Sequence, residues 1–195
     1  MNAGRLSEAV LFRLYLARLA LEDGTRRATD PMPFERMRSV LALDDAAELA
    51  LLTLLSIINQ RPKRDAALVE YLAPLVASHP SLTRHSGPLE RLRRLRDRVK
   101  HDGVIPSAED ARLAASDVDG FMREALLALV GRPLEEITRI EALEDAIAKE
   151  HLHAATKAIE AGDYGARSLS MRMRQWFPEF SGDPPWCRRA ARSAA

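Results

Sequence analysis

The stretch from Leu49 to Ile58 constrains the fold more than any other part of the sequence. It is apolar on nearly every side of a helix, since only Thr53 and Ser56 interrupt its run of aliphatic residues. A helix of this kind must be covered by other elements on most sides. At about ten residues it is well short of the roughly 20 that span a bilayer. The stretch therefore predicts the central helix of a bundle, in a protein without a membrane partner.

Most of the remaining sequence shows helical periodicity. Apolar residues recur at three- and four-residue steps, and no window has the sustained alternation that is typical of a β-strand. We expect helices over residues 6–21, 33–59, 67–76, 88–102, 108–130 and 134–161. The sequence therefore predicts an all-α fold, in which several helices form one bundle.

Glycine, proline and aspartate mark the expected helix ends. Asp23 and Gly24 should end the first helix, and Pro74 should kink or shorten the third. The second helix either runs unbroken or is interrupted at Asp44, which could cap a fresh start. Gly120 falls inside a helix, where it is tolerated and allows a neighbour to pack closely.

The expected helices divide the chain into three parts. With 195 residues the chain can form one well-buried core. The bundle is expected over residues 1–131, followed by a C-terminal helical extension over residues 132–165. Residues 166–195 contain glycine, proline and scattered arginine without a period, so they form a poorly patterned tail.

Charge and cysteine content limit the classes of function. The 29 basic and 28 acidic residues nearly cancel, so no overall field favours a polyanion as partner. Cys187 is the only cysteine, which excludes an internal disulfide and makes a cytoplasmic location the expectation. Functional signals must therefore be sought in the local arrangement of side chains.

The densest cationic cluster lies between Arg91 and Ser107. One apolar stripe runs along this segment, formed by Leu89, Leu92, Leu95 and Val99. The stripe predicts a helix, and arginines cover the rest of its surface. Gly103 is placed to cap that helix in the left-handed conformation, and Ser107 is placed to cap the next one. His101 is thus expected at a helix end, beside a tight turn.

Arg96 and His101 together offer the side chains that metal-free RNA cleavage needs. A guanidinium can hold a phosphate and stabilise the charge that develops on it. An imidazole, with an unperturbed pKa of about 6.5, can take or give a proton near neutral pH and contribute roughly 10²–10⁴-fold. RNA supplies its own nucleophile, the 2′-hydroxyl, so no cofactor or metal is predicted. The competing interpretation is a solvated helix end without chemistry.

This segment resembles a motif of the HEPN superfamily. Arg96, followed by Asp97 and then by His101 after four intervening residues, matches the Arg-x(4–6)-His signature. The extended pattern Lys100-His-x-Gly-x-x-Pro-Ser107 looks like the variant in which Lys-His-x-Gly leads into a capped helix. The basic helix is therefore distinguished by its resemblance to a family motif as well as by its charge.

Two further stretches extend the resemblance. The stretch Asp44-Asp-Ala-Ala-Glu48, with the apolar run that follows, is similar to a helix that packs beside the motif in such proteins. Residues 131–164 resemble a C-terminal extension seen in bacterial relatives. The likeness covers roughly residues 34–165 and leaves the first helix and the tail unexplained.

The resemblance implies a helical bundle that homodimerises and brings two motifs into one cleft. Many catalytic members are metal-independent endoribonucleases of toxin–antitoxin, abortive-infection or other defence systems. By matching position, Arg96 and His101 would be catalytic, Asp97 would orient them, and the product would carry a 2′,3′-cyclic phosphate. An antitoxin or a nucleotidyltransferase-like protein would be the partner. The alternative is a non-catalytic helical module that dimerises and binds nucleic acid or protein.

Charge and adjacency suggest which residues would contact RNA. These are Arg93, Arg94 and Lys100. The spacing of the catalytic pair adds a constraint, since five residues of an ideal helix place His101 about 140° from Arg96. The two share a face only if the last helical turn unwinds, so the motif is better suited to a dimer than to a monomer.

Other candidate sites carry less weight. His151 and His153 lie too close together for the His-Glu-x-x-His pattern of zinc enzymes and point to different sides of a helix. A surface helix is the simpler interpretation, and no metal site is predicted there. Cys187 has no base near it in the sequence and is expected to be inert.

Overall fold

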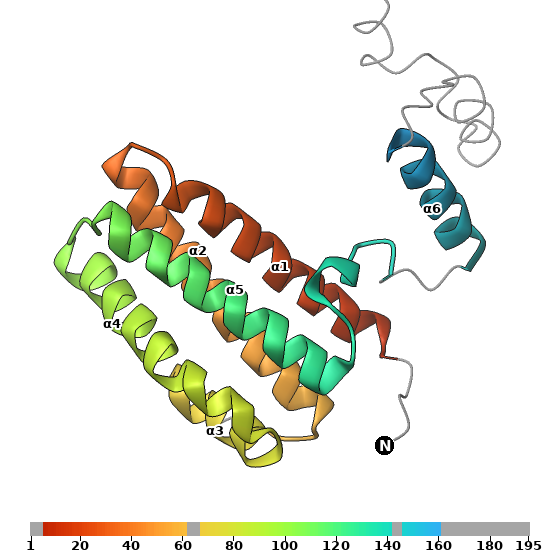
Figure 1. Cartoon of the computed structure of the whole chain (residues 1–195), viewed down its shortest axis with the longest axis horizontal. Helices are drawn as coiled ribbons and strands as arrows, with labels where there is room; N and C mark the ends of the chain where they lie inside the picture. Colours follow the sequence, from red (N-terminus) through yellow and green to blue (C-terminus); the bar gives the residue numbers. More distant parts are fainter. Residues whose placement is uncertain (1–5, 62–66, 142–145, 161–195) are drawn as a thin grey trace, which may run out of the picture. The chain divides into compact units, whose positions relative to one another are not determined.

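The computed structural model describes residues 6–61, 67–141 and 146–160 (Figure 1). These residues are mostly helical and contain no β-strand, so the predicted all-α fold is confirmed. The elements in chain order are α1 (Glu8–Ala28), α2 (Pro33–Ile57), α3 (Leu68–Ser78), the 3₁₀ helix η1 (Pro80–His85), α4 (Ser86–Asp102), α5 (Ala108–Val130), the 3₁₀ helix η2 (Leu134–Glu136) and α6 (Ala146–Glu160).

The chain forms two units, Met1–Glu144 and Asp145–Ala195. The first unit is the bundle, and its core continues past Gly131 because Leu134 and Ile137 are buried in it. The second unit contains α6. Within the described ranges, no helix is long and apolar enough to cross a membrane. The predicted tail over residues 166–195, which includes Cys187, lies outside the described residues.

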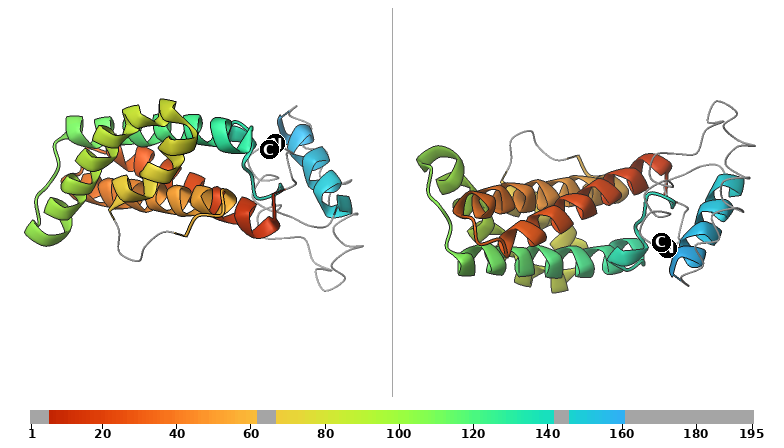
Figure 2. Two further views of the ribbon diagram at one scale, coloured as in Figure 1. Left: turned by 90° about the horizontal axis from the view of Figure 1, so that it is seen from below. Right: turned by 90° about the horizontal axis from the view of Figure 1, so that it is seen from above.

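Helix α2 is the central helix, as its apolar run predicts. It packs against α1, α3, α4 and α5, and Figure 2 shows it side by side with α1. Leu51, Leu54 and Leu55 of the run are completely buried, whereas Ser56 is exposed. The helix is continuous through Asp44, so of the two alternatives left open by the sequence, the uninterrupted helix is the observed one.

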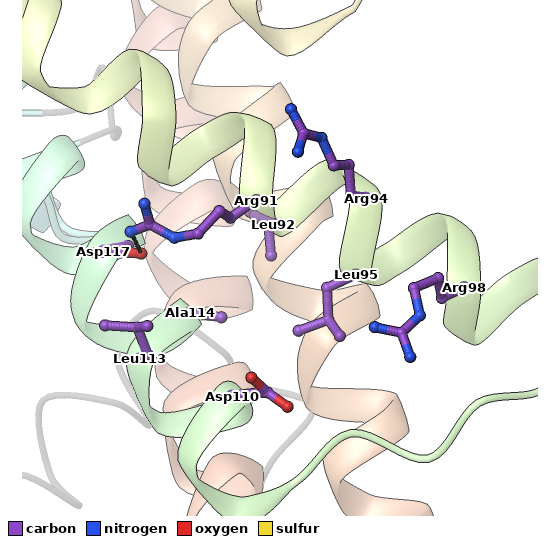
Figure 3. Close-up of a pocket in the computed structure, with 9 residues that line it drawn as sticks. All are labelled: Arg91, Leu92, Arg94, Leu95, Arg98, Asp110, Leu113, Ala114 and Asp117. Atoms are coloured by element: carbon purple, nitrogen blue, oxygen red, sulfur yellow. Dashed lines mark hydrogen bonds and ion pairs between the residues drawn. The ribbon is translucent and has the colours of Figure 1, made fainter.

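Helices α4 and α5 pack less closely than the helices around α2. They leave a cavity of about 200 Å³ between them, open to solvent on one side (Figure 3). Its floor is apolar, and charged side chains surround it.

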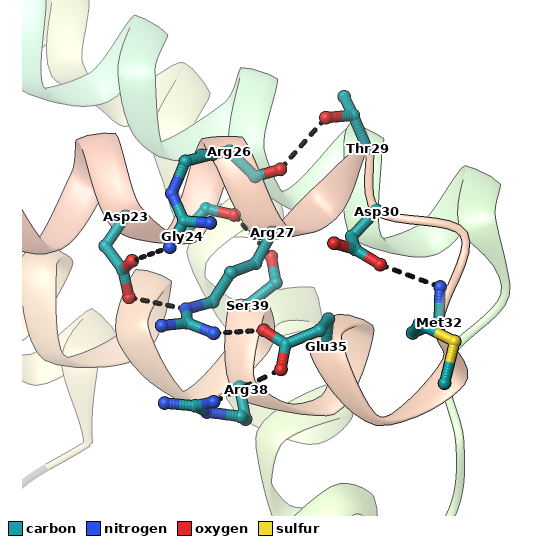
Figure 4. Close-up of polar contacts among 10 residues, drawn as sticks. All are labelled: Asp23, Gly24, Arg26, Arg27, Thr29, Asp30, Met32, Glu35, Arg38 and Ser39. Atoms are coloured by element: carbon teal, nitrogen blue, oxygen red, sulfur yellow. Dashed lines mark hydrogen bonds and ion pairs between the residues drawn. The ribbon is translucent and has the colours of Figure 1, made fainter.

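Helices α1 and α2 meet at a glycine that the sequence places at a helix end. Helix α1 continues through Asp23 and Gly24 to Ala28, so that expected end is wrong. Gly24 is buried, and a Cβ built on it would lie 2.8 Å from Cγ of Leu43 in α2. The Ser39 hydroxyl of α2 donates a hydrogen bond of 2.7 Å to the Gly24 carbonyl (Figure 4). The glycine therefore serves close helix packing.

The remaining differences concern helix ends. Helix α3 continues past Pro74 to Ser78, and part of the expected loop before Pro88 is the 3₁₀ helix η1. Gly120 does not provide the expected close packing, because the nearest atom to a Cβ built there is His85 Cε1 at 4.0 Å. Between residues 134 and 160 the predicted long helix is replaced by η2 and α6, so its first part is wrong.

Candidate nucleic-acid interface

The basic segment folds as α4 and the turn that follows it, as the sequence predicts. Gly103 has a φ of 65° and caps α4 in the left-handed conformation. The Asp110 N–H donates to Ser107 Oγ (3.0 Å), and the Ser107 N–H donates to the Asp110 carboxylate (3.3 Å). These reciprocal hydrogen bonds cap α5. His101 lies exposed in the last turn of α4, directly before this turn.

A contact from α2 holds the turn in place. Arg36 Nε donates a hydrogen bond of 3.0 Å to the carbonyl oxygen of Pro106. Pro106 itself is buried. The turn beside His101 is therefore attached to the beginning of the central helix, in addition to the two helices that it joins.

Arg93 and Arg96 bind a carboxylate of the central helix. Asp44 Oδ2 lies 3.3 Å from Arg93 Nη1 and 3.3 Å from Arg96 Nε, and the Asp44 side chain is only 3% exposed. Asp97 Oδ1 accepts a hydrogen bond of 2.9 Å from Arg96 Nη1. The Arg96 guanidinium is thus shared between two carboxylates, one buried and one half-exposed.

Asp44 occupies an unusual electrostatic environment. Burial raises the pKa of Asp44 to about 6, because the loss of hydration outweighs the attraction of Arg93 and Arg96. The negative charges of Glu48 and Asp45 raise this pKa further. The second carboxylate oxygen of Asp44 is buried and has no hydrogen-bond partner among the described residues. The charged form of this group therefore depends on the two arginines.

Arg96 and His101 do not come together within one chain. Helix α4 remains helical through Asp102, so its last turn does not unwind. The two side chains consequently keep the separation of about 140° around the helix axis that an ideal helix imposes. Arg96 faces α2, and His101 is exposed and makes no polar contact within the described part of the chain.

The three residues expected to contact RNA differ in their surroundings. Arg93 is half-buried and bound to Asp44. Arg94 is exposed and pairs only with Glu90, one turn earlier on the same helix. Lys100 is exposed and makes no ion pair with any described residue. Arg94 and Lys100 are therefore accessible to a polyanion, whereas Arg93 would first have to leave a buried carboxylate.

This arrangement separates two chemical roles. The exposed imidazole of His101 can transfer a proton to or from a bound ligand. The Arg96 side chain is only 18% exposed and is bound to Asp44 and Asp97, so its guanidinium can stabilise an oxyanion only through its exposed part. Cleavage would therefore require His101 and Arg96 to be supplied by different chains.

Asp44 is the residue of this cluster whose role the sequence reasoning missed. The apolar positions of α2 recur at Val40, Leu43, Ala47 and Leu51, and Asp44 lies on the same stripe. A carboxylate on an apolar stripe needs a cationic partner, because an unpaired buried charge is costly. The arginine-rich helix was the obvious source of that partner, so the pairing could have been expected from the pattern.

Another polar cluster, in which only His85 is buried, links η1 to α5. His85 Nε2 lies 2.7 Å from Glu124 Oε2, and Arg84 Nε donates to the same oxygen at 2.8 Å. Burial raises the pKa of Glu124, but hydrogen bonds from His85, Ser81 and Arg84 outweigh it and leave this pKa below its usual value. Arg84 and His85 of η1 both bind the Glu124 carboxylate of α5, so the cluster holds η1 on the bundle.

The described residues contain no group of three or more His, Cys, Asp or Glu side chains placed to hold a metal ion. His151 and His153 both lie on α6 and are exposed. Comparison with known proteins finds no match for this chain among protein-family models, curated proteins or solved structures.

Proposed function

We propose that the chain is a HEPN-type protein that acts on RNA, and that two copies together cleave it without a metal ion. The observation that supports this proposal is the exposed His101, fixed by a capped turn at the end of an arginine-rich helix. The 2′-hydroxyl would attack the adjacent phosphorus as His101 of one copy takes its proton. The bond to the 5′-oxygen would break, that oxygen would gain a proton, and a 2′,3′-cyclic phosphate would remain.

A two-fold dimer would resolve the separation within one chain. In such a dimer the exposed edge of the Arg96 side chain of one copy would contact the phosphate on which His101 of the other copy acts. Asp97 would hold the guanidinium in the correct orientation through its 2.9 Å hydrogen bond. The helix geometry supports this arrangement, because it keeps the two side chains apart in each copy.

The first test is RNA cleavage in EDTA by the wild-type protein and by His101→Ala. We expect cleavage that yields cyclic phosphate ends and that falls by roughly 10²–10⁴-fold in the variant. Arg13→Gln is the matched control for protein quality, because Arg13 is exposed on α1. Equal rates for wild type and His101→Ala would end the ribonuclease proposal.

The second test asks whether the site combines two chains. His101→Ala and Arg96→Gln are each expected to be inactive, but co-expression of the two should produce mixed dimers with one intact site. Random pairing makes about half of the dimers mixed, so about a quarter of wild-type activity should return. No recovery from folded, mixed dimers would contradict a shared site.

A non-catalytic function is the second candidate. It is favoured by one observation, namely that Asp44 and Asp97 already occupy the Arg96 guanidinium. A helical module that dimerises and binds nucleic acid or a partner protein would need no catalysis by His101. In that case RNA affinity would persist in His101→Ala, fall steeply with salt, and be accompanied by no cleavage.

A role in defence belongs to the same proposal. A toxin of this type would be neutralised by a partner, either a small antitoxin or a nucleotidyltransferase-like protein. Expression of the wild-type chain alone is then expected to arrest growth, and His101→Ala is expected to relieve the arrest. Unimpaired growth at confirmed expression of the wild type would speak against a toxin.

A further inference from the structure

The groove between α4 and α5 presents a surface suited to one flat, partly apolar group. Leu92 and Leu95 of α4 and Leu113 and Ala114 of α5 contribute apolar side chains to it (Figure 3). Leu113 is 47% exposed although it lies in a helix that packs on the core. The cavity of about 200 Å³ is smaller than the roughly 300–1,000 Å³ of sites that enclose a drug-sized ligand. It can hold one ring system, while the rest of the ligand stays outside.

The arginines at this groove form weaker or fewer ion pairs than Arg93 and Arg96, which bind the buried Asp44. Arg98 lines the groove and makes no ion pair within the described residues. Arg94 pairs only with the exposed Glu90, and Figure 3 shows its guanidinium pointing away from α5. Arg91 Nη2 lies 2.9 Å from Asp117 Oδ2 across the groove. Two cationic groups, Arg94 and Arg98, are therefore available to an anion at the rim.

The acidic groups at the groove already have partners. Asp117 is only 18% exposed and is neutralised by Arg91. Asp110 receives hydrogen bonds from the backbone N–H and the hydroxyl of Ser107, at 3.3 and 2.7 Å. A ligand that brought only negative charge would still meet these carboxylates. A ligand that places a neutral ring on the floor and an anionic group at the rim would keep its negative charge away from these carboxylates.

The arginine rim of the groove, but not its leucine floor, lies on the same side of α4 as His101, since Leu95 and Leu92 point about 120° and about 180° away from that residue. On an ideal helix Arg94 and Arg98 point within about 20° and about 60° of His101, whereas Arg96 is about 140° away. Arg98 precedes His101 by three residues, which is roughly 4.5 Å along the axis. A chain molecule bound along this side of α4 would therefore pass His101.

We propose that the α4–α5 groove binds single-stranded RNA, with one unstacked base on the leucine floor and the adjoining phosphates at Arg98 and Arg94. The inference rests on the proposed action on RNA and names the surface that delivers the strand to His101. Unpaired bases stack on aromatic side chains and guanidinium planes, and extruded bases also pack between apolar side chains, whereas the bases of a duplex are not free to do so. It also moves the expected phosphate contacts from Arg93, which Asp44 holds, to Arg98.

The test is the affinity of the full chain for a fluorescent ten-nucleotide single-stranded RNA, measured by anisotropy in EDTA as a function of salt. His101→Ala serves as the background, so that the probe stays intact. Adding Arg98→Gln is expected to weaken binding at least about fivefold and to reduce the slope of log K against log salt by about 0.7. Adding Leu113→Glu should weaken it further, since the charge would occupy the floor. A duplex of the same sequence should bind about tenfold more weakly than the single strand.

Arg13→Gln on the same background is the matched control, because it removes one exposed arginine from α1. It should change the affinity less than twofold. Equal losses for Arg98→Gln and Arg13→Gln would overturn the groove as the binding surface, as would absence of RNA binding or tighter binding of the duplex. An acidic peptide that competes for the groove while RNA does not bind would assign it to a protein partner and also overturn the inference.

The groove and the proposed catalysis can fail separately. If RNA binds in the groove but wild-type protein does not cleave it, the inference holds and the ribonuclease proposal fails. If His101→Ala abolishes cleavage but Arg98→Gln leaves both affinity and cleavage unchanged, catalysis holds and the groove inference fails.

Discussion

The contacts of α2 and the contact between α4 and α5 solve the same packing problem in opposite ways. Around Leu43 and Asp44, α2 is closed on two sides, by Gly24 of α1 and by two arginines of α4. Between α4 and α5 the side chains leave an open groove with arginines at its rim. The difference shows that the arginines of α4 fall into two groups. Arg93 and Arg96 pair with a buried carboxylate, whereas Arg94 and Arg98 are exposed and pair with no buried group.

Removing the arginines that face α2 should give the largest effect. Arg93→Gln with Arg96→Gln would leave the buried Asp44 without a cation, and loss of one side of a buried ion pair costs about 4 kcal/mol. We expect that loss in the free energy of unfolding, measured with urea at pH 8, where Asp44 of the wild type is ionised.

The matched control removes two arginines at the groove. Arg94→Gln with Arg98→Gln should change the free energy of unfolding by no more than about 0.5 kcal/mol, because neither side chain pairs with a buried group. Equal losses in the two double variants would erase the distinction between the groups.

The pH dependence of stability should identify Asp44 as the charged group at the closed contact. Its pKa is about 6 in the folded chain and 3.8 when unperturbed, so the folded state binds more protons between these values. The stabilisation is fully present below about pH 3.8 and is lost as the pH rises through about 6. At 1.36 kcal/mol per pKa unit the loss amounts to about 3 kcal/mol.

The measurement compares wild type with Asp44→Asn by urea unfolding between pH 4 and pH 7. The wild type should lose stability relative to the variant across this range, since asparagine does not titrate. Parallel curves for the two proteins would show that the Asp44 pKa does not change on folding.

Two glycines test how closely α1 and α2 pack, one at their contact and one away from it. Gly24→Ala should lower the free energy of unfolding by about 2 kcal/mol, because the new Cβ would lie 2.8 Å from Leu43 Cγ. Gly120→Ala is the control, with 4.0 Å to its nearest neighbour, and should raise stability by about 0.5 kcal/mol through helix propensity. Thermal unfolding of both variants and of the wild type measures these changes in stability. A tolerated Gly24→Ala would mean that α1 and α2 can separate at no cost.

The smallest effect is expected at the ion pair that crosses the groove. Arg91 and Asp117 are 2.9 Å apart, but Arg91 is more than half exposed, and exposed pairs contribute little. A double-mutant cycle with Arg91→Gln and Asp117→Asn should give a coupling energy of about 0.5 kcal/mol. A coupling several times larger would mean that the groove is held shut more firmly than its open side indicates.

The sequence predicted features that depend on local pattern. The buried run in α2, the left-handed Gly103 and the Ser107 cap are all present, because periodicity and capping chemistry act within a few residues. Gly24 was misinterpreted for the same reason. A glycine inside a helix and a glycine after a helix look alike until the neighbour that occupies its missing side chain is known.

The candidate site was predictable in part. The exposure of His101 at a helix end follows from the pattern around Gly103. The division of the arginines does not follow from charge alone, because Arg93 and Arg94 are adjacent in sequence and have opposite surroundings. Only the position of Asp44, in a helix almost fifty residues earlier, separates them.

The carboxylate of Asp44 also determines how α4 can move. Rolling or sliding of α4 against α2 would pull Arg93 and Arg96 away and leave an unpaired buried charge, at a cost of several kcal/mol. Widening of the groove on the opposite side of α4 by rotation of that helix would therefore carry the same cost. The shape of the groove is preorganised, so a ligand that fits loses little binding energy to rearrangement of the protein, and a ligand that is too large is excluded.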